Sequence, residues 1–97
     1  MYARVMIGTM KPGKMDEGVS IYRNSIVPTG KEQKGFKGAL FLTDSKTNKA
    51  ISISLWETEG DMKAGEATGY LQQQIVKLVP TFDTFPAPEV YAVSVQV

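Results

Sequence analysis

The single tryptophan of the chain stands where it could line a binding site. Trp56 lies near the end of an alternating, strand-like segment over 50–57, in which Ser52 and Ser54 share its face. Two small hydroxyls beside a large ring leave both space and hydrogen-bond partners, whereas a core tryptophan is usually surrounded by aliphatic side chains. The simpler alternative is a packed tryptophan with no ligand beside it.

Arg4 and Met6 form a second candidate group, because they share a parity on the first strand-like segment. The sequence alone does not say which face of the sheet that parity occupies. If it is the face of Trp56, an indole, a guanidinium and two hydroxyls line one pocket, which would suit a flat, anionic or phenolic small molecule. The alternative is an arginine satisfied within the fold. The predicted substrate-binding residues are Trp56, Ser52, Ser54, Arg4 and Met6, and no catalytic residue is assigned.

A carboxylate near the second helix is a weaker candidate. Glu66 has Met62 and Tyr70 at four-residue spacing, so it could edge the same pocket as an acid or a base. An exposed helix carboxylate is the simpler interpretation.

The composition limits the chemistry that is open to the chain. Its 97 residues include no cysteine and no histidine. Thiol nucleophiles, cysteine or imidazole metal sites and histidine-based triads are therefore excluded. The 11 basic and 10 acidic residues give a net charge of +1, which argues against a dedicated nucleic-acid binder. We expect one domain over 1–97 that is cytoplasmic, binds neither nucleic acid nor a membrane, and needs no metal or cofactor.

A glycine-rich turn at 8–14 has the spacing of a phosphate-binding loop up to Lys14. Met15 stands where a magnesium-binding hydroxyl belongs, and Pro12 removes a backbone N–H that would hold phosphate. We interpret the segment as a strand-to-helix turn.

The segment 34–41 resembles an RNA-recognition signature, and RNA-recognition domains share the element order derived below. Gly38 stands where a base-stacking aromatic is required, and the segment falls on the second strand rather than the third. RNA binding is therefore the least favoured alternative.

The hydrophobic pattern predicts the order β-α-β-β-α-β. We expect strands over 2–10, 35–43, 50–57 and 90–97, with helices over 15–26 and from 58 to about 79. Pro28 and Gly30 are expected to end the first helix, and Pro80 the second. This is the ferredoxin-like α+β fold, a four-stranded antiparallel sheet with both helices on one face.

Both faces of that sheet carry apolar residues, although helices cover only one. Ile51, Ile53 and Leu55 point away from Trp56 and need a cover of their own. We therefore expect a homodimer that packs sheet against sheet.

The chain resembles the antibiotic biosynthesis monooxygenase domain, of the dimeric α+β barrel superfamily. The resemblance rests on the turn at 11–13, the Gly-Phe-x-Gly at 35–38, the strand-end Trp56, and the segments 67–72 and 89–93. It implies a dimer with a cavity in each subunit between sheet and helices. It also implies Trp56 as a cavity wall, with its face turned toward the helices.

Active members of this family oxidise polycyclic phenols or quinols with dioxygen and without metal or flavin. The resemblance implies the same kind of activity for this chain. Haem-degrading members use a histidine on the second helix, near Glu66 or Ala67 here, so the lack of histidine excludes that branch. Antibiotic-tailoring members carry an asparagine four residues before the tryptophan, where this chain has Ser52. The resemblance thus predicts a cofactor-independent monooxygenase-like protein acting on a small aromatic compound. The alternative is a non-catalytic small-molecule-binding dimer of the same fold.

Overall fold

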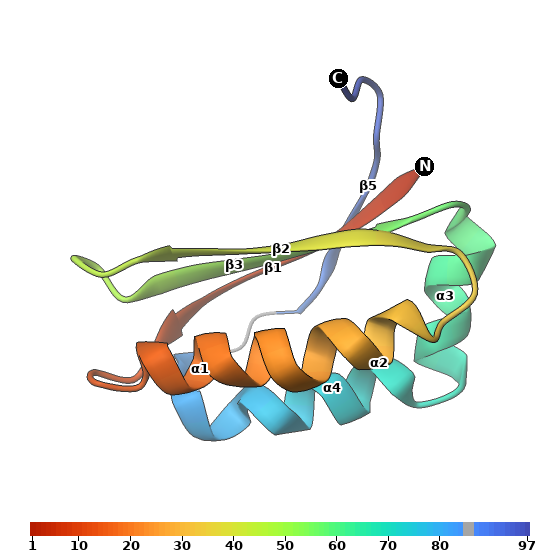
Figure 1. The fold of residues 1–97 in the computed structure, drawn as a ribbon. Helices are drawn as coiled ribbons and strands as arrows, with labels where there is room; N and C mark the ends of the chain where they lie inside the picture. Colours follow the sequence, from red (N-terminus) through yellow and green to blue (C-terminus); the bar gives the residue numbers. More distant parts are fainter. Residues whose placement is uncertain (85–86) are drawn as a thin grey trace.

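The computed structural model describes residues 1–84 and 87–97, which form an antiparallel sheet with helices on one side (Figure 1). Its strands are β1 Tyr2–Met10, β2 Phe36–Asp44, β3 Lys49–Trp56, β4 Phe82–Thr84 and β5 Glu89–Ala92. Its helical elements are α1 Met15–Ile21, the π-helical η1 Tyr22–Ile26, α2 Val27–Lys31, α3 Glu59–Ala67, α4 Tyr70–Leu78 and the 3-10 turn η2 Val79–Thr81. The ferredoxin-like α+β fold is confirmed. No helix in this part of the chain is both long enough and apolar enough to cross a membrane.

The sheet register decides which residues share a face. The strand order is β2-β3-β1-β4, and β5 also pairs with β1. Arg4 lies opposite Ser54, and Met6 lies opposite Ser52, in the antiparallel β1–β3 pair. Directly opposed residues project to the same side of a sheet, so both β1 side chains lie on the helix-covered face with Trp56.

The first helix runs past the proline that was expected to end it. Pro28 lies in the first turn of α2, and the helix continues to Lys31. A turn of π-helix precedes it, in which the Val27 N–H donates to the Tyr22 carbonyl five residues back. Proline has no N–H and crowds the preceding turn, so widening that turn lets the helix continue. The expectation that Pro28 ends the helix was wrong for this reason, and the helix ends one residue after Gly30, the second residue expected to end it.

The second helical segment is divided in two. Gly69 has a left-handed backbone (φ 83°) between α3 and α4, a conformation that glycine adopts without strain. The N-terminus of α3 is capped by Thr58, whose side chain accepts a hydrogen bond from the Asp61 N–H at 3.0 Å. The break changes the direction of the chain, so α4 runs alongside the first helix (Figure 1).

The C-terminal strand is shorter than predicted. Residues 82–84, expected to be part of a loop, form β4 on the far end of β1, and β5 ends at Ala92 rather than Val97. Its ladder with β1 finishes where the Val93 N–H donates to the Met1 carbonyl at 2.9 Å. Residues 93–97 extend beyond the sheet on the side away from the helices (Figure 1).

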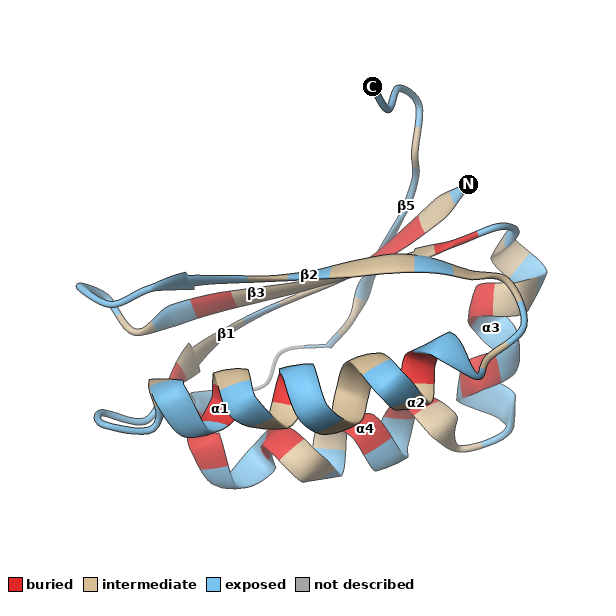
Figure 2. Cartoon of the chain, in the orientation of Figure 1, coloured by how far each residue is buried: buried red, intermediate tan, exposed pale blue. Residues whose placement is uncertain are grey.

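The core lies between the sheet and the helices. One cluster of its buried residues comes from five different elements and consists of Met10, Tyr22, Ala50, Leu78 and Phe82. Figure 2 shows that β2, an edge strand, is only partly buried along its length. None of the helices within residues 1–84 and 87–97 covers the other face of the sheet, on which Leu40 and Leu42 are 49% and 46% exposed.

Close approach of β4 to β1 depends on a glycine. A Cβ on Gly8 would lie 2.5 Å from the Thr84 carbonyl oxygen and 2.9 Å from the Phe82 ring. Gly8→Ala should therefore lower the free energy of unfolding by about 1–3 kcal/mol in urea denaturation, because β4 must shift. The matched control is Gly60→Ala, whose Cβ would meet only the Thr58 hydroxyl at 3.8 Å and should be neutral or stabilising. Equal stability of the two variants would contradict this packing.

Candidate functional site

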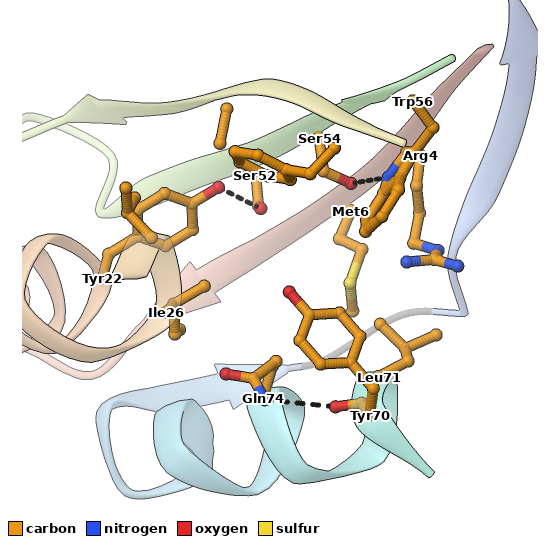
Figure 3. A pocket seen from close by; sticks show the side chains of 13 residues that line it. Arg4, Met6, Tyr22, Ile26, Ser52, Ser54, Trp56, Tyr70, Leu71 and Gln74 are labelled. Carbon is orange, nitrogen blue, oxygen red and sulfur yellow. Dashed lines mark hydrogen bonds between the residues drawn. The ribbon is translucent and has the colours of Figure 1, made fainter. Parts of the chain in front are cut away.

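Two adjacent hollows lie between the sheet and the helices. The first, here the Trp56 lobe, has a volume of about 50 Å³ and is lined by residues that include Arg4, Ser54, Trp56 and Tyr70. The second, here the Phe82 lobe, has a volume of about 40 Å³ and is lined by residues that include Gly8, Ala50, Leu78 and Phe82. Both are bordered by Met6, Tyr22, Ile26, Ser52 and Gln74, so the two lobes lie next to each other. All five predicted site residues border the Trp56 lobe (Figure 3).

Trp56 is held as a fixed wall of its lobe. The side chain is 1% exposed, and its Nε1 donates to the Ser54 Oγ at 2.9 Å. Its ring meets Phe36 edge-on at 5.6 Å and Tyr70 at 6.3 Å between centroids. The face of Ser52, Ser54 and Trp56 turns toward the helices, as the resemblance implied. The Ser54 hydroxyl thus accepts the hydrogen bond of the indole N–H. Ser52 lies closer to the centre of the cavity (Figure 3).

Arg4 reaches past the lobe to the third helix. Its guanidinium carbon lies 5.8 Å from the centroid of the Trp56 ring, and its Nη2 donates to the Met62 carbonyl at 2.7 Å. Burial lowers the pKa of Arg4, and the nearby Glu66 partly offsets this shift. Glu66 itself is 44% exposed, lies 3.8 Å from Arg4 and does not line the lobe. The guanidinium lies on the side of Trp56 away from Tyr22 (Figure 3), with the Nε unpartnered among the described residues.

A tyrosine and a serine form the partition between the two lobes. The Tyr22 hydroxyl lies 3.0 Å from the Ser52 Oγ and 3.4 Å from the Leu40 carbonyl. Its ring stacks on Phe41 at 4.5 Å between centroids, with an interplanar angle of 15°. The π turn begins at Tyr22, and π turns of this kind are frequent at functional sites. In the sequence, Tyr22 follows Met15 and Val19 at helical spacing, which indicates an apolar helix face, so its hydroxyl was not recognised as part of the site.

Two further polar side chains come from α4. The Tyr70 hydroxyl points into the cavity (Figure 3), and Gln74 is 6% exposed. The Gln74 Nε2 donates to the Tyr70 carbonyl at 3.3 Å, and its Oε1 accepts from the Lys77 Nζ at 2.9 Å. A signal for Gln74 was present, because its spacing of three from Leu71 and four from Leu78 places it on the buried stripe.

A groove on the surface leads toward the cavity. It lies between the first helix and the edge strand β2, has a volume of about 220 Å³, and is lined by Val19, Tyr22, Arg23, Val27, Ala39 and Phe41. Tyr22, Val27 and Ala39 also line the Trp56 lobe. Each lobe is smaller than the roughly 150 Å³ that holds a benzene ring. An aromatic ligand therefore requires these shared side chains to move, so that the Trp56 lobe and the groove become continuous.

The electrostatics of the lobe favour an anionic ligand oxygen. Arg4 is the one charged side chain among the described residues that line the Trp56 lobe. Burial raises the pKa of Tyr22, an effect that its bond to Ser52 partly offsets, and burial also raises the pKa of Tyr70. Both phenols are therefore protonated at neutral pH and are able to donate hydrogen bonds to a phenolate or enolate. The described residues contain no group of three or more metal-ligating side chains.

Alkaline titration should detect this burial. Because the pKa of Tyr22 is raised, its protonated form stabilises the fold at pH values below the ordinary tyrosine pKa of 10.0. This stability is lost as the pH rises through the pKa of Tyr22 in the folded state. Ultraviolet titration of tyrosinate should show a late component, and Tyr22→Phe should reduce it by one tyrosine while the contribution of Tyr70, whose pKa is also raised, stays. Ser52→Ala should move that component to still higher pH, because the Ser52 bond lowers the pKa. Unchanged titration curves in both variants would contradict a buried Tyr22 hydroxyl.

Structural comparison relates the fold to known oxygenases. SnoaB of Streptomyces nogalater, a cofactor-independent oxygenase, superposes with a TM-score of 0.78 at 16% identity, over 99% of this chain and 95% of SnoaB. The monooxygenase from the gene ActVA-Orf6 of Streptomyces coelicolor, in complex with nanaomycin D, gives 0.75 at 15% identity, over 99% and 89%. A candidate antibiotic biosynthesis monooxygenase of Chloroflexus aurantiacus gives 0.72 at 15% identity, over 99% and 95%.

The fold is therefore the one that antibiotic biosynthesis monooxygenase domains adopt, which confirms the resemblance at the level of structure. No family model matches the sequence, and no curated protein matches it. Because the identities are low, the likeness concerns the fold alone, and any activity depends on the residues of the site.

Proposed function

We propose that the protein is a cofactor-independent monooxygenase-like protein that oxidises a small phenol- or quinol-type aromatic compound beside Trp56. The observation that carries this proposal is the composition of the Trp56 lobe. Aromatic and aliphatic walls surround the hydroxyls of Tyr22, Ser52 and Tyr70, and the buried Arg4 also lines this space. Such a lobe would hold an electron-rich ring by stacking and its oxygen by hydrogen bonds.

The proposed chemistry needs little from the protein beyond binding and orientation. An anthrone-type CH₂ loses a proton, and the resulting enolate carbon attacks dioxygen, so that a C–O bond forms. The O–O bond then breaks; one oxygen stays on the carbon as a ketone, and the other leaves as water with both former CH₂ hydrogens. The substrate carbon supplies all four electrons that reduce the dioxygen. The protonated Tyr22 and Tyr70 and the Ser52 hydroxyl would stabilise the negative charge on the substrate oxygen.

Oxygen uptake tests the proposal. Anthrone incubated with the protein in air-saturated, chelator-treated buffer should consume one dioxygen per substrate and yield the quinone without hydrogen peroxide. Trp56→Phe should lower the rate of oxygen uptake because the smaller ring packs less closely against the substrate. Ser52→Ala should lower it because a hydroxyl that bonds the substrate oxygen is removed. Rates identical in all three proteins would reject the proposal. Binding without any uptake would instead identify a non-catalytic ligand-binding protein, the alternative left open by the sequence.

The pH dependence should follow the substrate. No carboxylate, lysine or histidine is among the described residues that line the Trp56 lobe, so no general base is at hand there. The rate should rise with pH along the ionisation of the substrate itself, and the inflection should shift when a more acidic anthrone is used. An inflection that stays at the same pH for two substrates of different acidity would indicate a catalytic base that this account lacks.

We also propose that two copies associate through the uncovered face of the sheet. Leu40 and Leu42 on β2 and Tyr91 on β5 are 49%, 46% and 52% exposed there, and Ile53 of β3 lies between Leu40 and Val5 in register. The valine-rich segment 93–97 extends past the same side (Figure 1). A contiguous apolar face of this kind is rarely left open in a monomer. A second copy offers the same apolar chemistry and a self-complementary surface.

A further inference from the structure

The geometry points to the Phe82 lobe as a binding site for a small apolar molecule, which in the proposed reaction is dioxygen. The lobe adjoins the Trp56 lobe through Met6, Tyr22 and Ser52, which line both. A molecule held there would lie next to a ring in the Trp56 lobe. The dioxygen role rests on the proposed function, whereas the capacity for small apolar molecules does not.

The walls of the Phe82 lobe are mostly hydrocarbon. Ala50 and Leu78 are buried, at 1% and 5% exposed, and they line the lobe with Phe41, Ile75 and Phe82. Ala50 and Gly8 lie directly opposite one another in the β1–β3 pair. The small side chain of Ala50 leaves the space open, since a larger residue at that position would fill it. At Gly8 the absence of a side chain instead lets Phe82 and Thr84 approach β1 closely. The lobe therefore depends on the size of the residue at position 50.

The polar groups that border the lobe already have partners. Tyr22 and Ser52 bond to each other at 3.0 Å. The Gln74 amide donates to the Tyr70 carbonyl and accepts from Lys77. A buried water needs two to four polar partners, and among the described residues this lobe offers few that are not already engaged. Apolar cavities of this type stay dry and take up apolar molecules such as xenon.

The size of the lobe selects its occupant. A water requires roughly 10–15 Å³ of such a space, so about 40 Å³ accommodates a diatomic molecule or a xenon atom. It is too small for a benzene ring, which needs roughly 150 Å³. The two lobes thus divide the reactants by size: the ring occupies the Trp56 lobe, which extends into the groove, and the gas molecule occupies the Phe82 lobe.

Xenon provides a test that does not depend on activity. Crystals of the full chain pressurised with xenon should show a xenon peak bordered by Ala50, Leu78 and Phe82. Ala50→Val should abolish that peak by filling the space. Ala39→Val, a matched substitution that lines the Trp56 lobe and the groove instead, should retain it. If Ala50→Val does not fold, Ile75→Phe fills the same lobe from α4. Ordered water in the lobe, or xenon bound only elsewhere, would overturn the inference.

Kinetics distinguish the dioxygen role from the proposed function itself. Ala50→Val should raise the KM for dioxygen several-fold with little change in the affinity for the aromatic compound, and Ala39→Val should do the reverse. Xenon binding in a protein that consumes no dioxygen would refute the proposed function and the dioxygen role. The inference that the Phe82 lobe binds small apolar molecules would still hold. Turnover with an unchanged KM for dioxygen in Ala50→Val would refute the dioxygen role and leave the proposed function.

Discussion

Trp56→Ala should lower the free energy of unfolding by about 3–5 kcal/mol, the typical cost of removing a large buried aromatic side chain. Trp56 is 1% exposed, and its ring meets Phe36, Tyr70 and the Arg4 guanidinium. Those three side chains come from β2, α4 and β1, so the cavity would weaken contacts among three elements. Domains of this size have total stabilities of about 5–15 kcal/mol, so the loss would be a large share.

Urea denaturation followed by circular dichroism measures this loss without depending on tryptophan fluorescence. Trp56→Phe keeps a ring but loses the bond from Nε1 to Ser54, and it should fall between the wild type and the alanine variant. Val76→Ala is a suitable control, because Val76 is 67% exposed on α4 and should change stability little. A Trp56→Ala variant as stable as the control would show that the ring does not connect the sheet to the helices.

Ile53→Lys should convert the proposed dimer into a monomer. Ile53 occupies the middle of the uncovered face, with Leu40 on one side and Val5 on the other. In a two-fold dimer the substitution enters the interface twice, so two unpaired charges would be buried. The dissociation constant of the dimer should rise at least about a hundredfold, since each loss of about 1.4 kcal/mol in binding free energy raises it by a factor of ten.

Sedimentation at micromolar concentration measures this effect. Leu40→Lys should act in the same way from the neighbouring strand, which guards against a folding defect peculiar to Ile53. Val76→Lys on the outer surface of α4 should leave the assembly unchanged. A wild-type protein that sediments as a monomer, or a dimer that survives both sheet substitutions, would contradict association through this face.

Much of the site could be predicted from alternation along one strand. The pattern over 50–57 correctly separated the face of Ser52, Ser54 and Trp56 from that of Ile53, because side chains in a strand alternate strictly. The placement of Arg4 and Met6 could not be predicted in this way. Their face depends on the pairing register between β1 and β3. The two strands are separated by about forty residues in the sequence, so long-range packing sets this register.

Other features escaped prediction because sequence patterns describe burial and not polar geometry. Tyr22 fitted an apolar helix stripe, yet its hydroxyl meets Ser52 across the cavity. Pro28 signals a helix end, but a π turn allowed the helix to continue to Lys31. The predicted strand over 90–97 ended at Ala92, because the β1 ladder finishes with the bond between Val93 and Met1. In each case the tertiary context outweighed a local signal.

The most direct test of the proposed site is a crystal structure of the protein soaked with anthraquinone, the product of anthrone oxidation. One ring should lie against Trp56, and one quinone oxygen should lie within hydrogen-bond distance of Ser52 or Tyr22. The remaining rings should extend through the gap between Val27 and Ala39 into the groove along β2. Anthraquinone bound only on the uncovered face of the sheet, with the Trp56 lobe unchanged, would contradict the account.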